Sequence, residues 1–334
     1  QFGAKAFSEI SGEVVQTVAF IIHKGFIDGL KPVCFRLVDV EQNEKNIYLK
    51  KQLNRFDSLT QSDYKNISGS PIAYWSTLKI HKIFLEATPL SDYALLKAGT
   101  STGDNPTFQR MWYEVEINNI EFKRYGNDFN SLKKWYPCNS GGGFRKWYGN
   151  NEVVINWEND GEAIKSHSSS AVRNQSYFFK PGLTYNKISS GIFAIRLREK
   201  GFLFDDTGRC LFTKDPKQQN ILMGFLCSKL ANKILKILTP SMSFTSNEIS
   251  KLPILITENN TINNNVIKTI ASAKLDWDSY ETSWDFTQNP ILRTQQLNLE
   301  QAFNTWQQQN ADAVAEMKRL EEENNKLFID AYGL

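Results

Sequence analysis

"GLTYNKISSGIFAIRL", at residues 182–197, decides the fold class because it combines runs of β-branched and aromatic residues with glycine turns. Similar short runs lie on both sides of it, at residues 111–117, 152–157 and 201–205. An amphipathic helix is expected at residues 218–238, where apolar side chains recur at intervals of three and four. The sequence therefore predicts an α+β domain between about residues 83 and 258.

The composition limits the classes of partner. The 334 residues are 41% hydrophobic and 22% charged, which is enough for a sizeable core. Because the formal net charge is only +3, any affinity for nucleic acid has to come from a local patch. Four cysteines without CxxC spacing and three histidines indicate a reduced, metal-free, cytoplasmic protein. The apolar run at residues 18–22 is too short for a membrane span, so no membrane partner is expected.

The first 75 residues are expected to hold two antiparallel strands, at residues 13–22 and 33–40. A helical segment at residues 39–56 and a turn-rich exit at residues 68–75 come after them. An isolated hairpin is not stable in water, so this piece belongs to a larger sheet or packs on later residues of the chain. The chain opens on Gln1 and its first residues are typical of the interior of a fold, which suggests a fragment of a longer protein.

The end of the chain carries the clearest pattern. A polar hinge is expected at residues 259–265 and an irregular or short helical connector at residues 276–286. Apolar residues then alternate in steps of four and three, with two asparagines on the same seam: Leu299, Phe303, Trp306, Asn310, Ala313, Met317, Leu320, Asn324 and Leu327. This heptad repeat predicts a helix of roughly 50 Å that begins after an Asn298 cap. Such a helix needs a partner helix to cover its seam.

Residues 134–150, "KWYPCNSGGGFRKWYGN", form the first candidate binding segment. Three glycines permit a close approach of the backbone to a ligand. Lys134, Arg145 and Lys146, together with the ring of Tyr148, suit phosphate contacts and base stacking. No GK[ST] comes after the glycines, so the segment is not a P-loop. The alternative, which the residues alone favour, is that the rings face a core while the cations lie in water.

Two other loops offer weaker candidates. In "GTSTGDNPTFQRMW", residues 99–112, Thr102 and Asn105 lie where a helix begins, so they either cradle a phosphate or simply cap the helix. In "SHSSSAVRN", residues 166–174, Arg173 and Asn174 belong to a polar loop that either orders on a ligand or is a solvated connection. The pair Asp205 and Asp206 precedes Thr-Gly, which favours a turn over a catalytic pair.

The chain carries no GxSxG, HExxH, GxGxxG or Walker motif and no obvious catalytic constellation. From the residues alone, it is an α+β binding domain with basic and aromatic loops and a long heptad helix. The ligand is not identified by these patterns.

Several blocks nevertheless resemble a known family. They are "FGAKAFSEISGEVVQTVAF", "SGSPIAYW", "GTSTGDNPTFQRMW", "KWYPCNSGGGFRKWYGNNEVVINWENDG", "YFFKPGLTYNKISSGIFAIR", "LMGFLCSKLANKILKILTPSMSFTSNEISKLPI" and "LFIDAYGL". In this order, along nearly the whole chain, they look like the C-terminal half of PglX-type adenine-specific DNA methyltransferases of BREX phage-defence systems, which are related to combined restriction-modification enzymes.

The resemblance implies a division into three parts. Residues 1–75 would be the tail of the methyltransferase catalytic domain with remnant strands of its sheet, residues 76–258 a mixed-sheet DNA target-recognition domain, and residues 259–334 a helical connector and spacer helix. The FxGxG-type and NPPY motifs of the family do not occur here. The resemblance therefore implies S-adenosylmethionine for the parent enzyme and no cofactor, and no activity, for this fragment alone.

The partner implied by the resemblance is double-stranded DNA from which an adenine is flipped out. Lys134, Arg145 and Lys146 are then expected at backbone phosphates, with Arg145 a candidate reader of guanine. Base or sugar contacts are expected for Tyr148, Asn150, Arg173 and Asn174, and Thr102 and Asn105 complete the predicted DNA-binding set. The alternative is an assembly module that docks other phage-defence proteins through the heptad helix.

Overall fold

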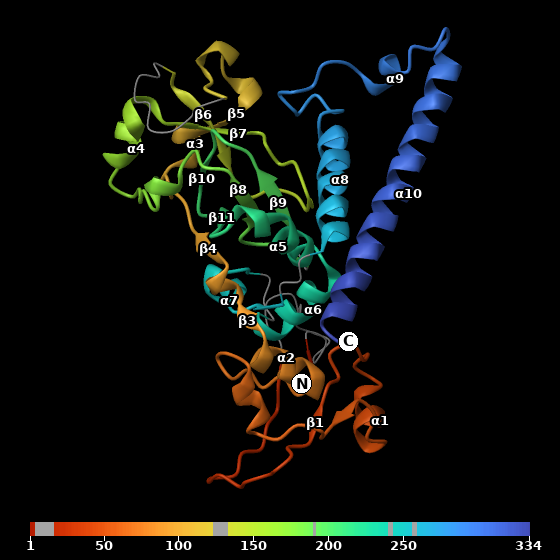
Figure 1. Cartoon of the computed structure of the whole chain (residues 1–334). Helices are drawn as coiled ribbons and strands as arrows, with labels where there is room; N and C mark the ends of the chain where they lie inside the picture. The colour runs from red at the N-terminus through yellow and green to blue at the C-terminus, as the bar shows by residue number, and fades with distance from the viewer. Residues whose placement is uncertain (4–16, 123–132, 190–191, 240–242, 256–258) are drawn as a thin grey trace. The chain divides into compact units, whose positions relative to one another are not determined.

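The computed structural model describes residues 1–3, 17–122, 133–189, 192–239, 243–255 and 259–334 (Figure 1). The chain divides into two compact units, Gln1–Ala87 and Thr88–Leu334, and each is described by itself. The three functional parts expected from the resemblance stay predictions.

The first unit contains short elements around a small core. Strand β1 (Cys34–Phe35) pairs antiparallel with β2 (Arg55–Phe56), and helices α1 (Lys45–Lys50), η1 (Asp63–Asn66, 3-10) and α2 (Leu78–Glu86) complete its described elements. The buried apolar residues are Leu37, Val40, Leu59, Tyr64, Ile67, Ala73, Ile80 and Ile83. His81 has a structural role, since its ring nitrogens contact Ser76 Oγ at 2.7 Å and the Asp63 carbonyl at 2.8 Å.

The strand prediction for this unit is largely wrong. Residues 33–40 form a strand only at β1, which pairs with β2 and not with the described residues 17–22. The apolar residues of this stretch instead lie in a turn, in which the Val40 amide donates to the Leu37 carbonyl. The side chains of Leu37 and Val40 are both buried. Residues 18–22 carry no strand, residues 13–16 lie outside the described residues, and the helical segment shrinks to α1.

In its described residues, the second unit contains two four-stranded sheets. The first has the order β10 (Leu203–Phe204), β6 (Trp135–Asn139), β7 (Val153–Asn156), β5 (Gln109–Met111), with β10 parallel to β6 and the other pairs antiparallel. The second is antiparallel with the order β4 (Ala94–Lys97), β11 (Gly208–Thr213), β8 (Gly182–Asn186), β9 (Ile195–Arg198). A two-residue pair, β3 (Thr88–Pro89) with β12 (Pro253–Ile254), is also antiparallel.

The two sheets share one core. Tyr136 and Ile155 of the first sheet belong to the same buried cluster as Cys210 and Phe212 of the second. The chain crosses from β10 to β11, and so from one sheet to the other, within residues 205–207. The predicted α+β class with mixed sheets is confirmed, although residues 112–117 continue β5 not as a strand but as 3-10 turns.

Helices surround these sheets. They are α3 (Asn105–Phe108), α4 (Glu162–Lys165), α5 (Gln219–Leu226), α6 (Lys229–Leu238), α7 (Ser246–Ser250), α8 (Asn260–Trp277), α9 (Pro290–Arg293) and α10 (Leu299–Ala331). Short 3-10 helices are η2 (Leu90–Asp92), η3 (Trp112–Glu114), η4 (Ile117–Asn119), η5 (Glu158–Gly161), η6 (Gln175–Tyr177) and η7 (Pro216–Gln218).

Two helix predictions need correction. The helix expected at residues 218–238 is broken into α5 and α6, because the Ser228 hydroxyl accepts a hydrogen bond from the Ala231 amide and starts a new helix. The hinge expected at residues 259–265 is the first part of α8. Its cap is Asn259, whose side chain accepts from the Thr261 and Ile262 amides, and the next asparagines continue the helix.

The long heptad helix is confirmed as α10, with Asn298 as its cap. Its C-terminal half packs beside α8 and against α5 (Figure 1), and its N-terminal half has Ala302 as its one buried residue among those described. Phe328 is 1% exposed and meets Phe225 at 5.6 Å between ring centroids. The seam asparagine Asn324 accepts a hydrogen bond from Asn265 of α8 at 3.3 Å. For the C-terminal half of α10, the partner helix that the seam requires is therefore α8 of the same chain.

Replacing Phe328 with alanine is expected to lower the free energy of unfolding of the second unit by about 3–4 kcal/mol, since a large buried ring leaves a cavity. Urea unfolding followed by circular dichroism measures this change. Val314 of the same helix is 69% exposed, so Val314→Ala is the matched control and should change stability by less than about 0.5 kcal/mol. Equal effects of the two substitutions would contradict the packing described for α10.

Candidate nucleic-acid interface

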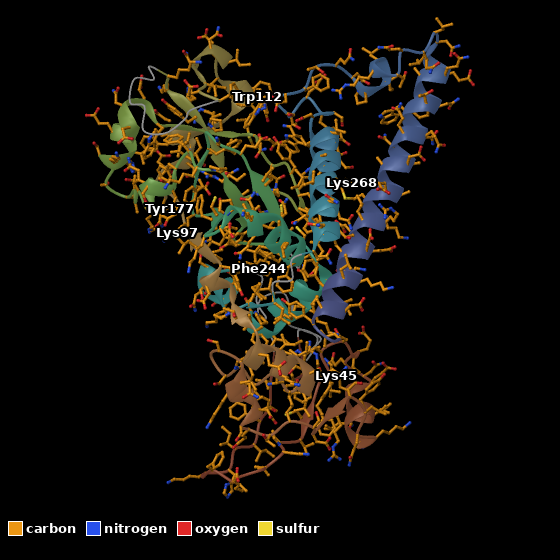
Figure 2. All side chains as sticks on the ribbon, in the orientation of Figure 1. Lys45, Lys97, Trp112, Tyr177, Phe244 and Lys268 are labelled. Atoms are coloured by element: carbon orange, nitrogen blue, oxygen red, sulfur yellow. The ribbon has the colours of Figure 1, made fainter. Side chains whose placement is uncertain are left out.

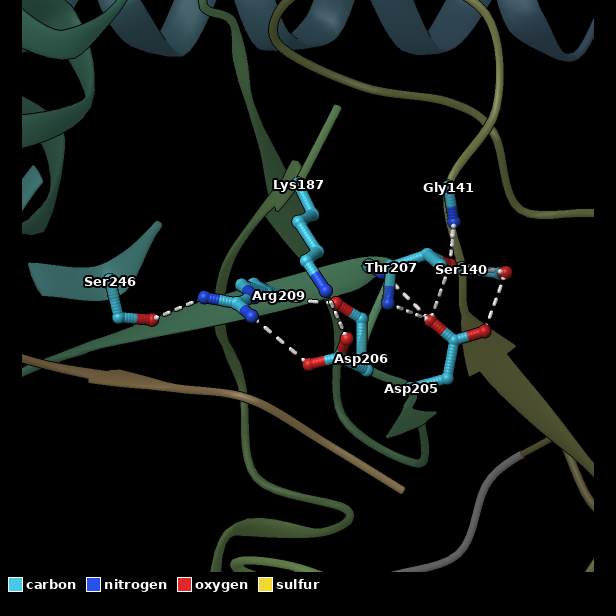
Figure 3. A network of polar contacts seen from close by, with 9 residues as sticks. Ser140, Gly141, Lys187, Asp205, Asp206, Thr207, Arg209 and Ser246 are labelled. Atoms are coloured by element: carbon cyan, nitrogen blue, oxygen red, sulfur yellow. Dashed lines mark hydrogen bonds and ion pairs between the residues drawn. The ribbon is translucent and has the colours of Figure 1, made fainter. Parts of the chain in front are cut away.

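The turn at Asp205 joins the glycine segment at Ser140 to Gln109 of the loop at residues 99–112, and Figure 3 shows the contact with Ser140. Asp205 is 4% exposed, and its Oδ1 accepts from the Thr207 amide at 2.8 Å, the Thr207 hydroxyl at 2.7 Å and the Gly208 amide at 2.7 Å. Its Oδ2 accepts from the Ser140 hydroxyl at 2.6 Å and from Gln109 Nε2 at 3.1 Å. One carboxylate thus joins β5, the glycine loop after β6 and the β10–β11 turn, which confirms a turn at this position.

Asp206 faces the opposite side of the same turn and pairs with two cations. Lys187 Nζ lies 2.5 Å from its Oδ2, and Arg209 Nη2 lies 3.0 Å from its Oδ1 (Figure 3). Burial raises the pKa of Asp206, but the hydrogen bond from Lys187 and the charge of Arg209 outweigh it, so this pKa lies below its usual value. The two acids therefore have separate structural partners and do not form a catalytic pair.

The glycine loop after β6 is pinned from three directions. The Gly141 amide donates to Thr207 Oγ1 at 2.8 Å. Asn186 Nδ2 donates to the Gly142 carbonyl at 2.7 Å, and Asn150 Nδ2 donates to the Gly143 carbonyl at 2.7 Å. Gly142 has φ +139°, and a Cβ there would lie 3.0 Å from Asn150 Nδ2. The Asn150 side chain therefore occupies the inside of this loop.

The segment after the glycines binds the C-terminal helices. Arg145 Nη1 lies 3.0 Å from Asp276 Oδ2 of α8, and its guanidinium lies 4.8 Å from the centre of the Trp277 ring. Lys146 Nζ lies 2.8 Å from Glu321 of α10. The phosphate contacts predicted for Arg145 and Lys146 stay predictions, and to form they have to compete with these carboxylates.

The two rings of the same segment are buried. Trp147 is 3% exposed and donates from Nε1 to Glu321 Oε1 at 2.8 Å. Tyr148 is 1% exposed, and burial raises the pKa of its phenol. Its hydroxyl donates to Glu199 at 3.1 Å and accepts from Lys274 of α8 at 2.8 Å. The rings face the core, as the residues alone favoured, while the cations pair with acids instead of lying in water.

Lys134 lies away from this group. It precedes β6 at the end opposite to the glycine loop, so the five strand residues separate the two by roughly 16 Å. The Lys134 side chain is exposed, and its Nζ lies 5.6 Å from the centre of the Trp135 ring. The nine predicted residues therefore do not form one site.

Four of the nine lie together in a second place. Ser101 pairs with Ala171 in a single antiparallel bridge, and Asn174 Nδ2 donates to the Ala98 carbonyl at 2.8 Å. The Thr102 hydroxyl is buried and donates to Asn105 Oδ1 at 2.5 Å. Arg173, next to Asn174, is exposed. The structure thus brings the loop at residues 99–112 against the loop at residues 166–174.

The cap of α3 is Asp104, whose Oδ1 accepts from the Thr107 amide at 3.2 Å. The hydrogen bond from the Thr107 hydroxyl lowers the pKa of Asp104. A carboxylate therefore occupies the start of this short helix, as expected for a simple cap.

Beside these loops lies a cluster that the sequence analysis missed. Lys97 Nζ and Lys180 Nζ lie 5.0 and 5.2 Å from the centre of the Tyr177 ring. Lys97 and Tyr177 are neighbours in Figure 2 although 80 positions separate them in the chain. The "Lys97–Tyr177 surface" is defined as Lys97, Arg173, Asn174, Tyr177 and Lys180. Its one local signal is the run "YFFK" at residues 177–180.

The cations of the Lys97–Tyr177 surface differ from those of the glycine segment. Within the described ranges, no ion pair to a carboxylate is found for Lys97, Arg173 or Lys180. The same part of the chain contains no group of three or more His, Cys, Asp or Glu side chains that is able to hold a metal ion. Every helix that the structure describes is too short or too polar to cross a membrane.

Comparison with known proteins gives related sequences. No protein-family model matches the chain. The adenine-specific methyltransferase PglX of Lacticaseibacillus casei (strain Zhang) is 36% identical over 355 residues, covering 99% of this chain and 29% of that protein. The adenine-specific methyltransferase BrxX of Escherichia coli O9:H4 (strain HS) is 38% identical over 295 residues, covering 87% of this chain and 24% of that protein. The chain spans less than a third of the length of either relative.

Identity at this level over most of the chain makes it homologous to part of the adenine-specific methyltransferases. Within that class it belongs to the PglX type, as the sequence blocks indicated.

Replacing Asp205 with alanine is expected to lower the free energy of unfolding by about 3 kcal/mol, because the buried Gly208 amide and the Thr207 amide both lose their acceptor. Chemical denaturation of the purified chain measures the loss. Asp312 on the exposed side of α10 accepts only from Gln308 among the contacts described, so Asp312→Ala is the control and should be near neutral. A neutral Asp205→Ala would contradict the joining role of this carboxylate.

The ion pairs of Asp206 predict a pH dependence. Its pKa is lower in the folded chain than the value of about 3.9 in an unfolded one, so its stabilising contribution is complete above that pH. The contribution is lost as the pH falls through the folded pKa. The difference in thermal midpoint between the unmodified chain and Asp206→Asn should therefore be largest near pH 6 and shrink below about pH 4. A difference that stays constant down to pH 3 would rule out this origin.

Proposed function

We propose that the chain recognises double-stranded DNA for a PglX-type adenine-specific methyltransferase that works in the bacterial cytoplasm, where the DNA lies. The observation that carries the proposal is the Lys97–Tyr177 surface, whose cations have no carboxylate partner in the described part of the chain. Two lysines beside a tyrosine ring suit two phosphates with a sugar between them. Arg173 and Asn174, both predicted from the sequence, extend this surface toward base edges.

Methyl transfer is proposed to depend on residues outside this chain. A methyltransferase requires S-adenosylmethionine, and the FxGxG-type and NPPY motifs that the resemblance connects with methyl transfer do not occur in this chain. In the glycine loop at residues 140–143, the Gly141 amide already donates to Thr207 Oγ1 at 2.8 Å. We therefore assign the cofactor to the full-length enzyme and DNA recognition to this part.

The glycine segment is proposed as a second contact with the duplex. Lys134, Arg145, Lys146 and Asn150 are kept in the predicted set. The contact predicted for Tyr148 is not kept, because this side chain is buried and its hydroxyl is hydrogen-bonded to Glu199 and Lys274. Because Arg145 and Lys146 already hold Asp276 and Glu321, their net contribution to affinity is expected to be smaller than that of unpaired lysines.

A second function is favoured by one specific observation on α10. Its N-terminal half exposes Leu299 by 74% and Phe303 by 45%, so an apolar seam is left uncovered by the residues that the structure describes. This is the surface on which another phage-defence protein would dock. Leu320 of the same seam is not available to a docking partner, because it is 1% exposed and belongs to the core.

The DNA proposal is tested by binding of the chain to a random duplex pool at several salt concentrations, with sequencing of the retained DNA. Selective retention of one short motif at physiological salt is the expected result. The double variant Lys97→Gln with Lys180→Gln should reduce the slope of log K against log salt by roughly 1.8, that is, by two phosphate contacts.

The control removes two exposed lysines elsewhere in the same unit. Lys268 of α8 and Lys318 of α10 are both exposed, and Figure 2 labels Lys268 on its helix. Lys268→Gln with Lys318→Gln should leave the slope unchanged. Equal slopes for the two double variants would refute the Lys97–Tyr177 surface. Loss of partner capture in Phe303→Ser, with DNA binding absent from the unmodified chain, would support the docking function instead.

A further inference from the structure

Strand β9 places two arginines in the interior of the second unit. Arg196 and Arg198 are each 1% exposed. The guanidinium of Arg198 is well matched, since its Nε donates to Asn139 Oδ1 at 2.8 Å and its other nitrogens donate to the Lys180 and Phe202 carbonyls. Arg198 is therefore a structural cation that neutral acceptors satisfy.

Arg196 lacks such partners. Its Nη2 donates to Asn186 Oδ1 at 3.0 Å, whereas its Nε has no acceptor among the described residues. No carboxylate in the described part of the chain forms an ion pair with it. An arginine side chain stays charged in proteins, and an unpaired buried charge costs several kcal/mol. The Arg196 guanidinium thus lacks an anion that would balance its charge.

A small cavity lies at this guanidinium. Arg196 lines it together with Phe144, Arg145, Asn186, Ile192 and Phe244. Its volume is about 10 Å³, which is room for one water-sized atom. Burial, with a smaller effect from the nearby charge of Arg145, lowers the pKa of Arg196 to about 10. Two guanidiniums at one cavity favour a negatively charged occupant.

The mouth of the cavity suits a nucleic-acid backbone. Phe144 is 53% exposed and Ile192 is 52% exposed, so apolar surface for a sugar surrounds the opening. Gly142 and Gly143 lie exposed beside Phe144 and let a backbone come close. Asp276 occupies one side of the Arg145 guanidinium, which keeps further donors for a second anion.

We propose that this cavity takes one oxygen of a DNA backbone phosphate, with Arg196 beneath it and Arg145 at its edge. The proposal rests on the proposed function and adds a specific, buried phosphate site to it. A tetrahedral phosphate is able to place one oxygen on Arg196 and another on Arg145 at the same time. Phe144 then contacts the adjoining deoxyribose.

The first test uses inorganic phosphate and needs no DNA. Thermal unfolding of the whole chain is followed while phosphate replaces chloride at constant ionic strength. The midpoint of the unmodified chain should rise with phosphate, and that of Arg196→Met should not. Without phosphate, Arg196→Met should be at least as stable as the unmodified chain, because an unpaired buried charge has been removed.

Arg198→Met is the matched control from the same strand. It should be clearly less stable, because buried carbonyls and Asn139 lose their donor. Equal destabilisation by both substitutions would make Arg196 a purely structural cation and would overturn the proposal. Ala194→Leu gives a second variant, in which Arg196 is kept and a side chain fills the cavity that Ala194 also lines. It should lose the phosphate response while retaining the fold.

The second test measures binding to duplex DNA against salt. Arg196→Met and Ala194→Leu should each reduce the slope by roughly 0.9, the value for one phosphate. An unchanged slope in variants that still bind DNA would overturn the cavity proposal and leave the proposed function standing. No binding by the unmodified chain would overturn both. An acetate response equal to the phosphate response would identify the occupant as a carboxylate, such as an acidic side chain of a protein, and would also overturn the proposal.

Discussion

The burial of the Asp205 carboxylate is the constraint on which the second unit depends. A buried carboxylate is tolerated only when hydrogen-bond donors replace its water, and here five donors from three segments do so. The backbone strengthens the same junction, because the Gly99 amide donates to the Asp205 carbonyl and the Asp205 amide donates to the Asn139 carbonyl. A Cβ at Gly99 would lie 1.9 Å from the Phe204 carbonyl oxygen, so only glycine fits there. The two sheets, the glycine loop after β6 and the loop at residues 99–112 are therefore positioned by one turn.

The cations discussed for this unit contact neutral acceptors, carboxylates or an aromatic ring. The kind of partner indicates whether a cation has a structural role or is available for binding. Arg198 is satisfied by neutral acceptors in the core. Arg145 and Lys146 meet carboxylates of α8 and α10 and hold those helices against the sheets. The lysines of the Lys97–Tyr177 surface meet only a ring. Net charge of +3 conceals this division, because it sums cations that are already neutralised with those that are not.

Local signals predicted the parts of the fold that depend on local physics. The heptad of α10 and the α+β class were predicted because periodicity reports which side of an element is buried. The break before α6 and the start of α8 depend on single caps, Ser228 and Asn259, which a polar stretch conceals equally well as loop residues. The Lys97–Tyr177 surface depends on the pairing of β4 with β11, which no local pattern reports. The sequence left open whether the rings of this segment stack on bases or face a core. The rings of Trp147 and Tyr148 are buried because they contact helices more than a hundred residues away in the chain.

The Asn265–Asn324 pair has a consequence for the outward face of α10. The Asn324 carbonyl oxygen accepts from Asn265 in one alignment of the two helices, so this pair favours a single register of α10 on α8. Because a helix is rigid over this length, a register fixed at its C-terminal end also fixes which side chains face outward at its other end. Leu299 and Phe303 are the large apolar side chains exposed there. The direction in which these two side chains point is therefore set by a contact more than twenty residues away in the same helix.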